Sequence, residues 1–206
     1  MSSLLNLSRL IDRLNEFVGR WVSWLVLAAV LISAVNAIVR KAFNYSSNAF
    51  LEIQWYLFAA VFLLAAGYTM LRQEHVKIDV VLGRFSKRTQ VKVEIFGIVA
   101  FLMPFVAAVI YLSWPLVTKA WVSGEMSSNA GGLIRWPVFA LLPAGFALLG
   151  LQGLSEMIKR FAFLQGLIDD PTKKTQAKSA EEELAEFLLQ KEVAARDAAL
   201  LAGVKK

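Results

Sequence analysis

The sequence predicts an all-α membrane protein with four transmembrane helices, an N-terminal amphipathic helix and a C-terminal cytoplasmic helical tail. Three observations lead to this prediction: 57% of the 206 residues are apolar, only 18% are charged, and the charges are segregated so that four long stretches contain none. A helix needs about 20 mostly apolar residues to cross the hydrocarbon layer of a bilayer. Each of the four stretches has about that length.

Residues 1–20 precede the first uncharged stretch and have the pattern of an amphipathic helix. Apolar residues recur at intervals of three and four, and charged residues fill the opposite side. We expect a retained helix that lies in the headgroup region before the chain turns into the bilayer; a plain cytoplasmic extension of the first span is the alternative. The apolar positions are Leu4, Leu7, Leu10, Ile11, Leu14, Phe17 and Val18, and the charged positions are Arg9, Asp12, Arg13, Glu16 and Arg20.

The membrane domain is expected at residues 21–160, with a charged residue at each end of every span. Backbone groups in lipid find hydrogen-bond partners only within a helix or a closed barrel, and barrel strands would show short alternating segments. Continuous apolar runs therefore predict helices, which we place at residues 21–39, 53–71, 95–118 and 136–155. Three prolines inside the spans are expected to bend them, because each removes a backbone hydrogen bond: Pro104, Pro115 and Pro143.

The basic residues near the spans are divided unequally between the two membrane faces. Thirteen lie on the face that holds the N-terminus, the second loop and the tail, whereas the opposite face has Arg40, Lys41, Lys119 and Arg135. Short basic loops resist translocation, so the positive-inside rule predicts that both termini are cytoplasmic. Because the positive charge lies beside membrane spans, it indicates topology and does not indicate a nucleic-acid partner.

Residues 161–206 differ in character from the membrane domain. Asp169, Asp170 and Pro171 open a polar linker, and residues 181–203 are rich in Ala, Leu and Glu. This composition predicts a cytoplasmic linker followed by a tail helix that would be marginal in isolation. Nothing in the tail indicates its purpose.

The residue types needed for catalysis or metal binding are scarce. There are no cysteines and one histidine, His75, so disulfides, thiolate sites and multi-histidine metal centres within this chain are excluded. His75 and Asp79 lie in the loop that begins at Arg72, but no nucleophile, oxyanion site or cleft accompanies them. We expect no enzyme activity and no cofactor, and we interpret Arg72, His75 and Asp79 as a structural turn at the cytoplasmic face.

Two polar residues at the outer end of the second span are candidate contacts, because polar groups at this depth are costly. Glu52 lies close in depth to Arg40 and Lys41, and Gln54 follows it. A transport site would need further carboxylates at similar depth, and the sequence places none there. An interfacial ion pair or a contact with a partner is therefore expected.

The third loop contains the adjacent glycines Gly131 and Gly132 without the spacing of a phosphate-binding loop. It is expected to be an external turn that reverses the chain. Pro137 suits the first turn of the fourth helix, and Trp136 suits the aromatic belt at the membrane interface.

Three segments taken together resemble the small membrane subunit of tripartite ATP-independent periplasmic (TRAP) transporters. They are Glu-Ile-Gln-Trp-Tyr at 52–56, the charged loop at 72–79 and Gly-Gly-Leu-Ile-Arg-Trp-Pro at 131–137. Pro-Ala-Gly-Phe at 143–146 and Gly-Leu-Gln at 150–152 add to the resemblance, which extends from about Leu10 to Arg160.

This resemblance implies a bacterial inner-membrane protein that pairs with a large membrane subunit and a periplasmic substrate-binding protein. The large subunit would carry the substrate and sodium sites, and this chain would be part of the fixed scaffold. The substrate would be an organic acid, and the form of residues 131–137 is closest to the subgroup associated with keto acids and other carboxylates. We hypothesise that Glu125 and Arg135 help to receive the binding protein, with Glu52, Gln54 and Trp136 as further candidate contacts.

A scaffold role predicts that small residues, including Gly67, Gly97, Gly145 and Gly150, let these helices pack closely against others. The alternative function is a self-contained channel or carrier that oligomerises. It would need a polar stripe along at least one span, and the first, third and fourth spans offer little beyond Asn36, isolated Ser and Thr residues, and Gln152.

Overall fold

The structure is a computed structural model that describes residues 2–44, 47–73, 84–168, 188 and 191. The chain divides into two units, Met1–Asp169 and Asp170–Lys206. The predicted linker and tail helix lie almost entirely outside the described residues, so they stay predictions. The first unit contains all the helices described below.

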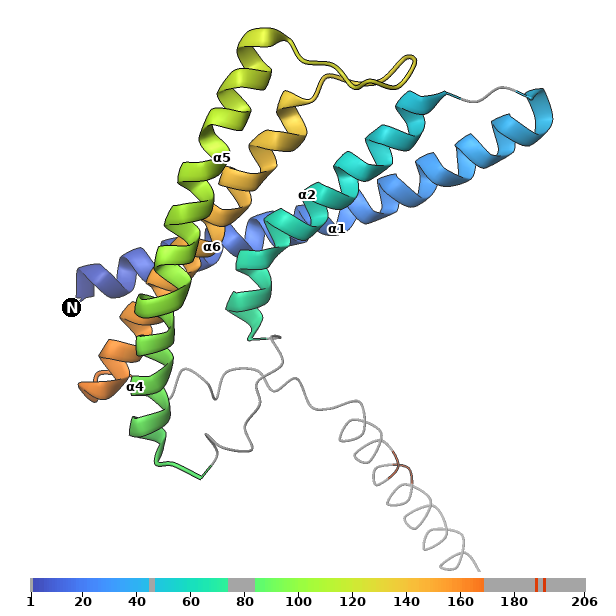
Figure 1. Cartoon of the computed structure of the whole chain (residues 1–206). Helices are drawn as coiled ribbons and strands as arrows, with labels where there is room; N and C mark the ends of the chain where they lie inside the picture. The colour runs from blue at the N-terminus through green and yellow to red at the C-terminus, as the bar shows by residue number, and fades with distance from the viewer. Residues whose placement is uncertain (1, 45–46, 74–83, 169–187, 189–190, 192–206) are drawn as a thin grey trace, which may run out of the picture. The chain divides into compact units, whose positions relative to one another are not determined.

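The described part of the first unit is built from helices (Figure 1). They are α1 (Ser2–Phe43), α2 (Asn48–Arg72), α4 (Lys87–Gly97), the π-helical segment Ile98–Leu102, α5 (Met103–Ser123) and α6 (Trp136–Leu164). Four helical stretches are long and apolar enough to cross a membrane: α1, α2, the run Lys87–Ser123 and α6. The prediction of an all-α protein with four spanning helices is confirmed.

Helix α1 runs through Arg20 without a break, where a turn between an amphipathic helix and the first span was expected (Figure 1). No helix-breaking residue stands at that point. Gly19 lies inside the helix and permits close approach to α2, since a Cβ there would overlap the ring of Tyr68. Residues 2–20 are therefore helical and continuous with the first span, and a position in the headgroup region stays a prediction.

Helix α6 occupies a central position, because it packs against α1, α2 and α5, and α1 also packs against α2. Small residues permit close approach at these contacts. A Cβ added to Gly145 would lie 2.5 Å from the backbone oxygen of Leu63, and one added to Gly150 would lie 3.0 Å from Val106. At Gly97 no other side chain or helix lies within 4 Å of the would-be Cβ in the described part of this chain, so close packing there stays a prediction.

The third spanning stretch contains a local change of helix type before its first proline. The backbone N–H of Met103 bonds to the carbonyl oxygen of Ile98, five residues earlier, and Pro104 follows immediately. A π turn is a recognised way to accommodate a disruption of the α-helical bonding ladder. Pro115 and Pro143 lie inside α5 and α6, which continue through them as helices.

Candidate functional site

Residues 124–135, which connect α5 to α6, form a short β-hairpin-like turn, here named the hairpin. Gly124 ends α5 in the left-handed conformation, with a φ of 62° that suits glycine. Met126 and Ile134 form an isolated antiparallel bridge. The N–H of Arg135 donates to the carbonyl oxygen of Glu125 at 2.9 Å, which closes the base of the hairpin.

The two adjacent glycines shape the tip of the hairpin. Gly131 has a φ of 70°, and the N–H of Gly132 donates to the carbonyl oxygen of Asn129 at 2.9 Å. A Cβ on Gly132 would lie 2.5 Å from the Cβ of Ser127, so no larger residue fits without a shift. The chain reversal predicted for the glycine pair is confirmed, as is the start of the fourth helix beside Pro137.

Glu52, in the first turns of α2, is the centre of the contacts that hold the hairpin. Only 3% of the residue is exposed. Its carboxylate accepts hydrogen bonds from the backbone N–H of Leu133 at 2.6 Å, from the Asn129 side chain at 2.7 Å, and from the Ser127 hydroxyl. Three neutral donors from one loop thus satisfy the buried charge, at a residue for which an ion pair or a contact with a partner was expected.

Two further residues on the same face of α2 form hydrogen bonds with the hairpin. The side-chain amide of Asn48 donates to the carbonyl oxygen of Ala130 at 3.1 Å, and the hydroxyl of Tyr56 donates to that of Ile134 at 3.1 Å. Asn48, Glu52 and Tyr56 are spaced four residues apart, so their side chains follow one another along one side of the helix. The hairpin is therefore attached to α2 at its tip, its middle and its base.

The other predicted contact residues lie in two places: some belong to the hairpin, and others make contacts between helices. Arg135 and Glu125 form an ion pair at 3.3 Å, with side chains that are 37% and 36% exposed, so both are accessible from outside. Trp136 packs edge-to-face against Trp121, with ring centroids 4.5 Å apart. Gln54 lies elsewhere, because its side-chain oxygen accepts a bond from Ser33 of α1 at 2.8 Å.

The predicted structural turn after α2 is described only at its beginning. Arg72 donates to the hydroxyl of Tyr68 at 3.0 Å and to the carboxylate of Glu16 on α1 at 3.4 Å. Its guanidinium group also lies 5.2 Å from the centre of the Tyr68 ring. His75 and Asp79 lie outside the described residues, so the turn as a whole stays a prediction.

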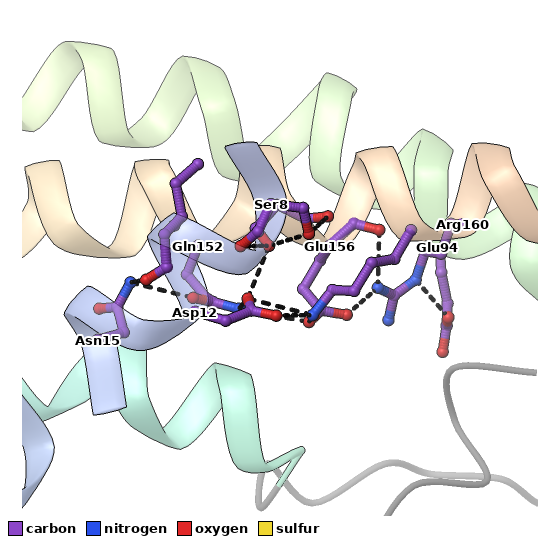
Figure 2. Close-up of polar contacts among 10 residues, drawn as sticks. Ser8, Asp12, Asn15, Glu94, Gln152, Glu156 and Arg160 are labelled. Atoms are coloured by element: carbon purple, nitrogen blue, oxygen red, sulfur yellow. Dashed lines mark hydrogen bonds and ion pairs between the residues drawn. The ribbon is translucent and has the colours of Figure 1, made fainter. Parts of the chain in front are cut away.

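A second polar cluster, the polar network, joins α1, α4 and α6, and sequence reasoning did not find it (Figure 2). Figure 2 shows these side chains converging from the three helices. A signal was present in α1 and α6, since their polar positions recur every three or four residues on one face. The network consists of Ser8, Asp12 and Asn15 of α1, Glu94 of α4, and Gln152, Ser155, Glu156, Lys159 and Arg160 of α6.

Asp12 is the point at which α1 joins the network. Its carboxylate accepts a bond from the Ser155 hydroxyl at 2.7 Å and one from the Gln152 amide at 3.0 Å, and it forms an ion pair with Lys159 at 3.2 Å. Asn15 donates to the side-chain oxygen of Gln152 at 3.0 Å. These bonds connect residues about 140 positions apart in the sequence.

Arg160 joins α4 to α6 at the other end of the network. It forms an ion pair with Glu94 at 2.7 Å and a second with Glu156, one turn earlier on α6. The Arg160 and Glu156 side chains are 6% and 2% exposed. Lys159 also pairs with Glu156. Buried charges that are paired and hydrogen-bonded in this way fix the positions of the helices that carry them.

The polar network is suited to fixing α1, α4 and α6 relative to one another. Within the described ranges, no group of three or more His, Asp or Glu side chains is placed to hold a metal ion. Among the described buried side-chain atoms, Oδ1 of Asn15 has no hydrogen-bond partner. It lies against α2, where a Cβ on Gly67 would overlap it, so a glycine is needed there.

Comparison with known proteins identifies the family. Residues 29–163 match the family described as "Tripartite ATP-independent periplasmic transporters, DctQ component", a match that covers well over half of the chain and includes α2, the hairpin and nearly all of α6. No curated protein and no solved structure matches the chain. The family match confirms the resemblance found in the loop motifs. The chain therefore belongs to the DctQ-component family and is a small membrane subunit of a tripartite ATP-independent periplasmic transporter.

Proposed function

We propose that this chain is a fixed scaffold for the large transport subunit of its transporter. The observation that supports this role best is the polar network, in which the charged side chains of α1, α4 and α6 bond to one another. Groups engaged in this way restrain helix movement and are not available to bind a passing ion or anion. The substrate and coupling-ion sites are then on the large subunit.

The hairpin is the part that we assign to docking of the substrate-binding protein. Its Glu125–Arg135 pair is accessible, and the attachment to α2 gives that pair a defined position. The unequal distribution of Lys and Arg supports an orientation in which the hairpin is periplasmic and both termini are cytoplasmic. A periplasmic binding protein would meet the transporter on that face.

The transported compound in this proposal is an organic acid taken up together with sodium. The form of residues 131–137 favours keto acids or other carboxylates. Uptake of labelled candidate acids by proteoliposomes containing the complete transporter, with and without a sodium gradient, tests both points. Uptake that is independent of sodium, or absent for every carboxylate, would contradict this part of the proposal.

The scaffold role is tested by producing the chain with and without its large partner. We expect the protein to be monodisperse and stable in detergent only in the complex, because a scaffold subunit produced alone would leave its partner-facing surface uncovered. A chain that is equally stable and monodisperse when produced alone would argue against an obligate partner.

The docking role is tested by exchanging charges within the Glu125–Arg135 pair. Arg135→Glu and Glu125→Arg each place like charges together, whereas the double variant restores the ion pair with its direction reversed. If a binding protein recognises these charges, uptake that depends on it falls in the double variant as well. Arg20→Glu, an exposed charge reversal in α1, is the matched control. Full recovery in the double variant, or no effect in any variant, would show that the pair does not take part in docking.

A further inference from the structure

We infer that Glu52 is a positioning residue for docking: it sets the conformation of the hairpin that receives the binding protein, although it is itself covered. This inference rests on the proposed docking role of the hairpin. In this inference, the buried carboxylate of Glu52 positions the exposed Glu125–Arg135 pair of the hairpin.

The three donors to Glu52 come from different parts of the hairpin. Ser127 is on the outgoing arm, Asn129 is at the tip, and Leu133 is on the returning arm. One carboxylate therefore ties both arms and the tip to the same point on α2. The separation of the arms cannot change without breaking at least one of these bonds.

A carboxylate is the side chain that this arrangement requires. Oε1 accepts from Ser127 and Asn129, and Oε2 accepts from the N–H of Leu133. A glutamine has nearly the same shape but only one oxygen, and its NH2 group would face a donor. Glu52→Gln thus removes the charge and turns one of the two oxygens into a donor, so at least one of the three bonds must be lost or reversed in direction, while the packed volume hardly changes.

The remaining attachments fix the ends of the hairpin but not its middle. Asn48 and Tyr56 bind the backbone oxygens of Ala130 and Ile134, so they restrain one point of the tip and one of the base. The outgoing arm is joined to α2 through the bond from Ser127 to Glu52. That arm carries Glu125, one half of the accessible ion pair. Loss of the Glu52 bonds would therefore leave that arm joined to α2 only through the returning arm, to which it is bonded at Leu133 and Arg135.

The mobility of a spin label on the hairpin reports how firmly Glu52 attaches the hairpin to α2, and it does not depend on a transport assay. The chain has no native cysteine, so Ser128→Cys, at an exposed position beside the Glu52 contacts, gives a single labelling site. In the complete transporter, we expect Glu52→Gln to raise the mobility of the label. Glu16→Gln is the control: it makes the same change in a carboxylate that pairs with Arg72, at the far end of α2, and leaves mobility unchanged.

Uptake by proteoliposomes measures the consequence for docking. We expect Glu52→Gln to raise the concentration of binding protein needed for half-maximal uptake by about tenfold, equivalent to the loss of about 1.4 kcal/mol of binding free energy, with a smaller effect on maximal uptake. A mere folding defect would instead lower maximal uptake by reducing the amount of assembled transporter.

A disulfide provides the test of positioning. The Asn48 side chain hydrogen-bonds to the backbone of Ala130, so Asn48→Cys with Ala130→Cys places two thiols on neighbouring parts of α2 and the hairpin, and mass analysis shows whether the disulfide has formed. In the Glu52→Gln background, oxidation of this pair is expected to restore the half-maximal concentration, and reduction is expected to remove the rescue. Recovery on oxidation would show that the hairpin position, and not the Glu52 charge, is what the binding protein senses.

The outcomes separate this inference from the proposed docking role. Unchanged label mobility in Glu52→Gln, or a formed disulfide without rescue, would overturn the positioning role. If Glu52→Gln leaves the concentration of binding protein needed for half-maximal uptake unchanged while the Glu125–Arg135 exchange alters it, the positioning role of Glu52 is refuted and the docking role of the hairpin stays supported. If neither set of variants alters it, both fail.

Discussion

The polar network leads to a quantitative prediction for Arg160→Met. Methionine keeps much of the length of the side chain but removes its charge and its donors. Arg160 pairs with Glu94 and with Glu156, whose side chain is 2% exposed. The substitution therefore removes one of the cations paired with the buried carboxylate of Glu156. This loss lowers the unfolding free energy far more than the loss of an exposed charge does.

The magnitude depends on which partners remain. Breaking a buried ion pair by removing one member typically costs about 3–5 kcal/mol of unfolding free energy. Glu156 keeps contacts with Lys159 and Gln152, so we expect the lower end, about 3 kcal/mol. Arg20→Met is the matched control, because Arg20 pairs with Glu16 but has a side chain that is 73% exposed. It should cost less than about 1 kcal/mol.

The assay is unfolding of the complex with the large partner in mixed micelles, by titration with a denaturing detergent, followed by tryptophan fluorescence. Adding Glu156→Gln to Arg160→Met should recover part of the loss, because the carboxylate left behind is then neutral. A cost for Arg160→Met no greater than that for Arg20→Met would refute the reasoning. A further loss of stability on neutralising Glu156 in the Arg160 variant would refute it as well.

Two further predictions use the same protein preparations. Gly145→Ala should destabilise the chain by about 1–3 kcal/mol, because its Cβ would lie 2.5 Å from the backbone oxygen of Leu63; Gly97→Ala, in open space, should be neutral or stabilising by up to about 1 kcal/mol in the same assay. For the orientation, a membrane-impermeant maleimide should label Ser128→Cys in intact spheroplasts and label Ser3→Cys only after permeabilisation; the opposite pattern would contradict cytoplasmic termini.

The spans could be predicted from the sequence because their signal is local. Uninterrupted apolar length determines whether a segment can cross a bilayer, and each of the four windows carries that information by itself. The tip of the hairpin was predictable for a similar reason, since the requirement for Gly131 at a positive φ concerns a single residue. Neither inference needed knowledge of which segments are neighbours in space.

The contacts of Glu52 and the polar network could not be predicted, because they depend on pairing between distant segments. The donors to Glu52 lie 75 to 81 residues away, and Ser8 meets Ser155 across 147 residues. One sequence contains no record of such neighbours. The depth of Glu52 indicated that it needs a polar partner, an ion pair or a contact with another subunit, but could not indicate that donors from the hairpin satisfy the carboxylate.

The unbroken course of α1 has a consequence for the lipid around the transporter. At about 1.5 Å per residue, its 42 residues extend for about 63 Å, roughly twice the 30 Å of a typical hydrocarbon layer. Exposed apolar side chains continue as far as Leu4, which favours an oblique path with much of the helix in contact with lipid. The uncharged stretch at residues 21–39 is by itself long enough to cross the hydrocarbon layer, so a straight helix can bring its amphipathic N-terminal part to the headgroup region only by tilting the span. The stability of the subunit should therefore depend on acyl-chain length, with an optimum set by bilayer thickness.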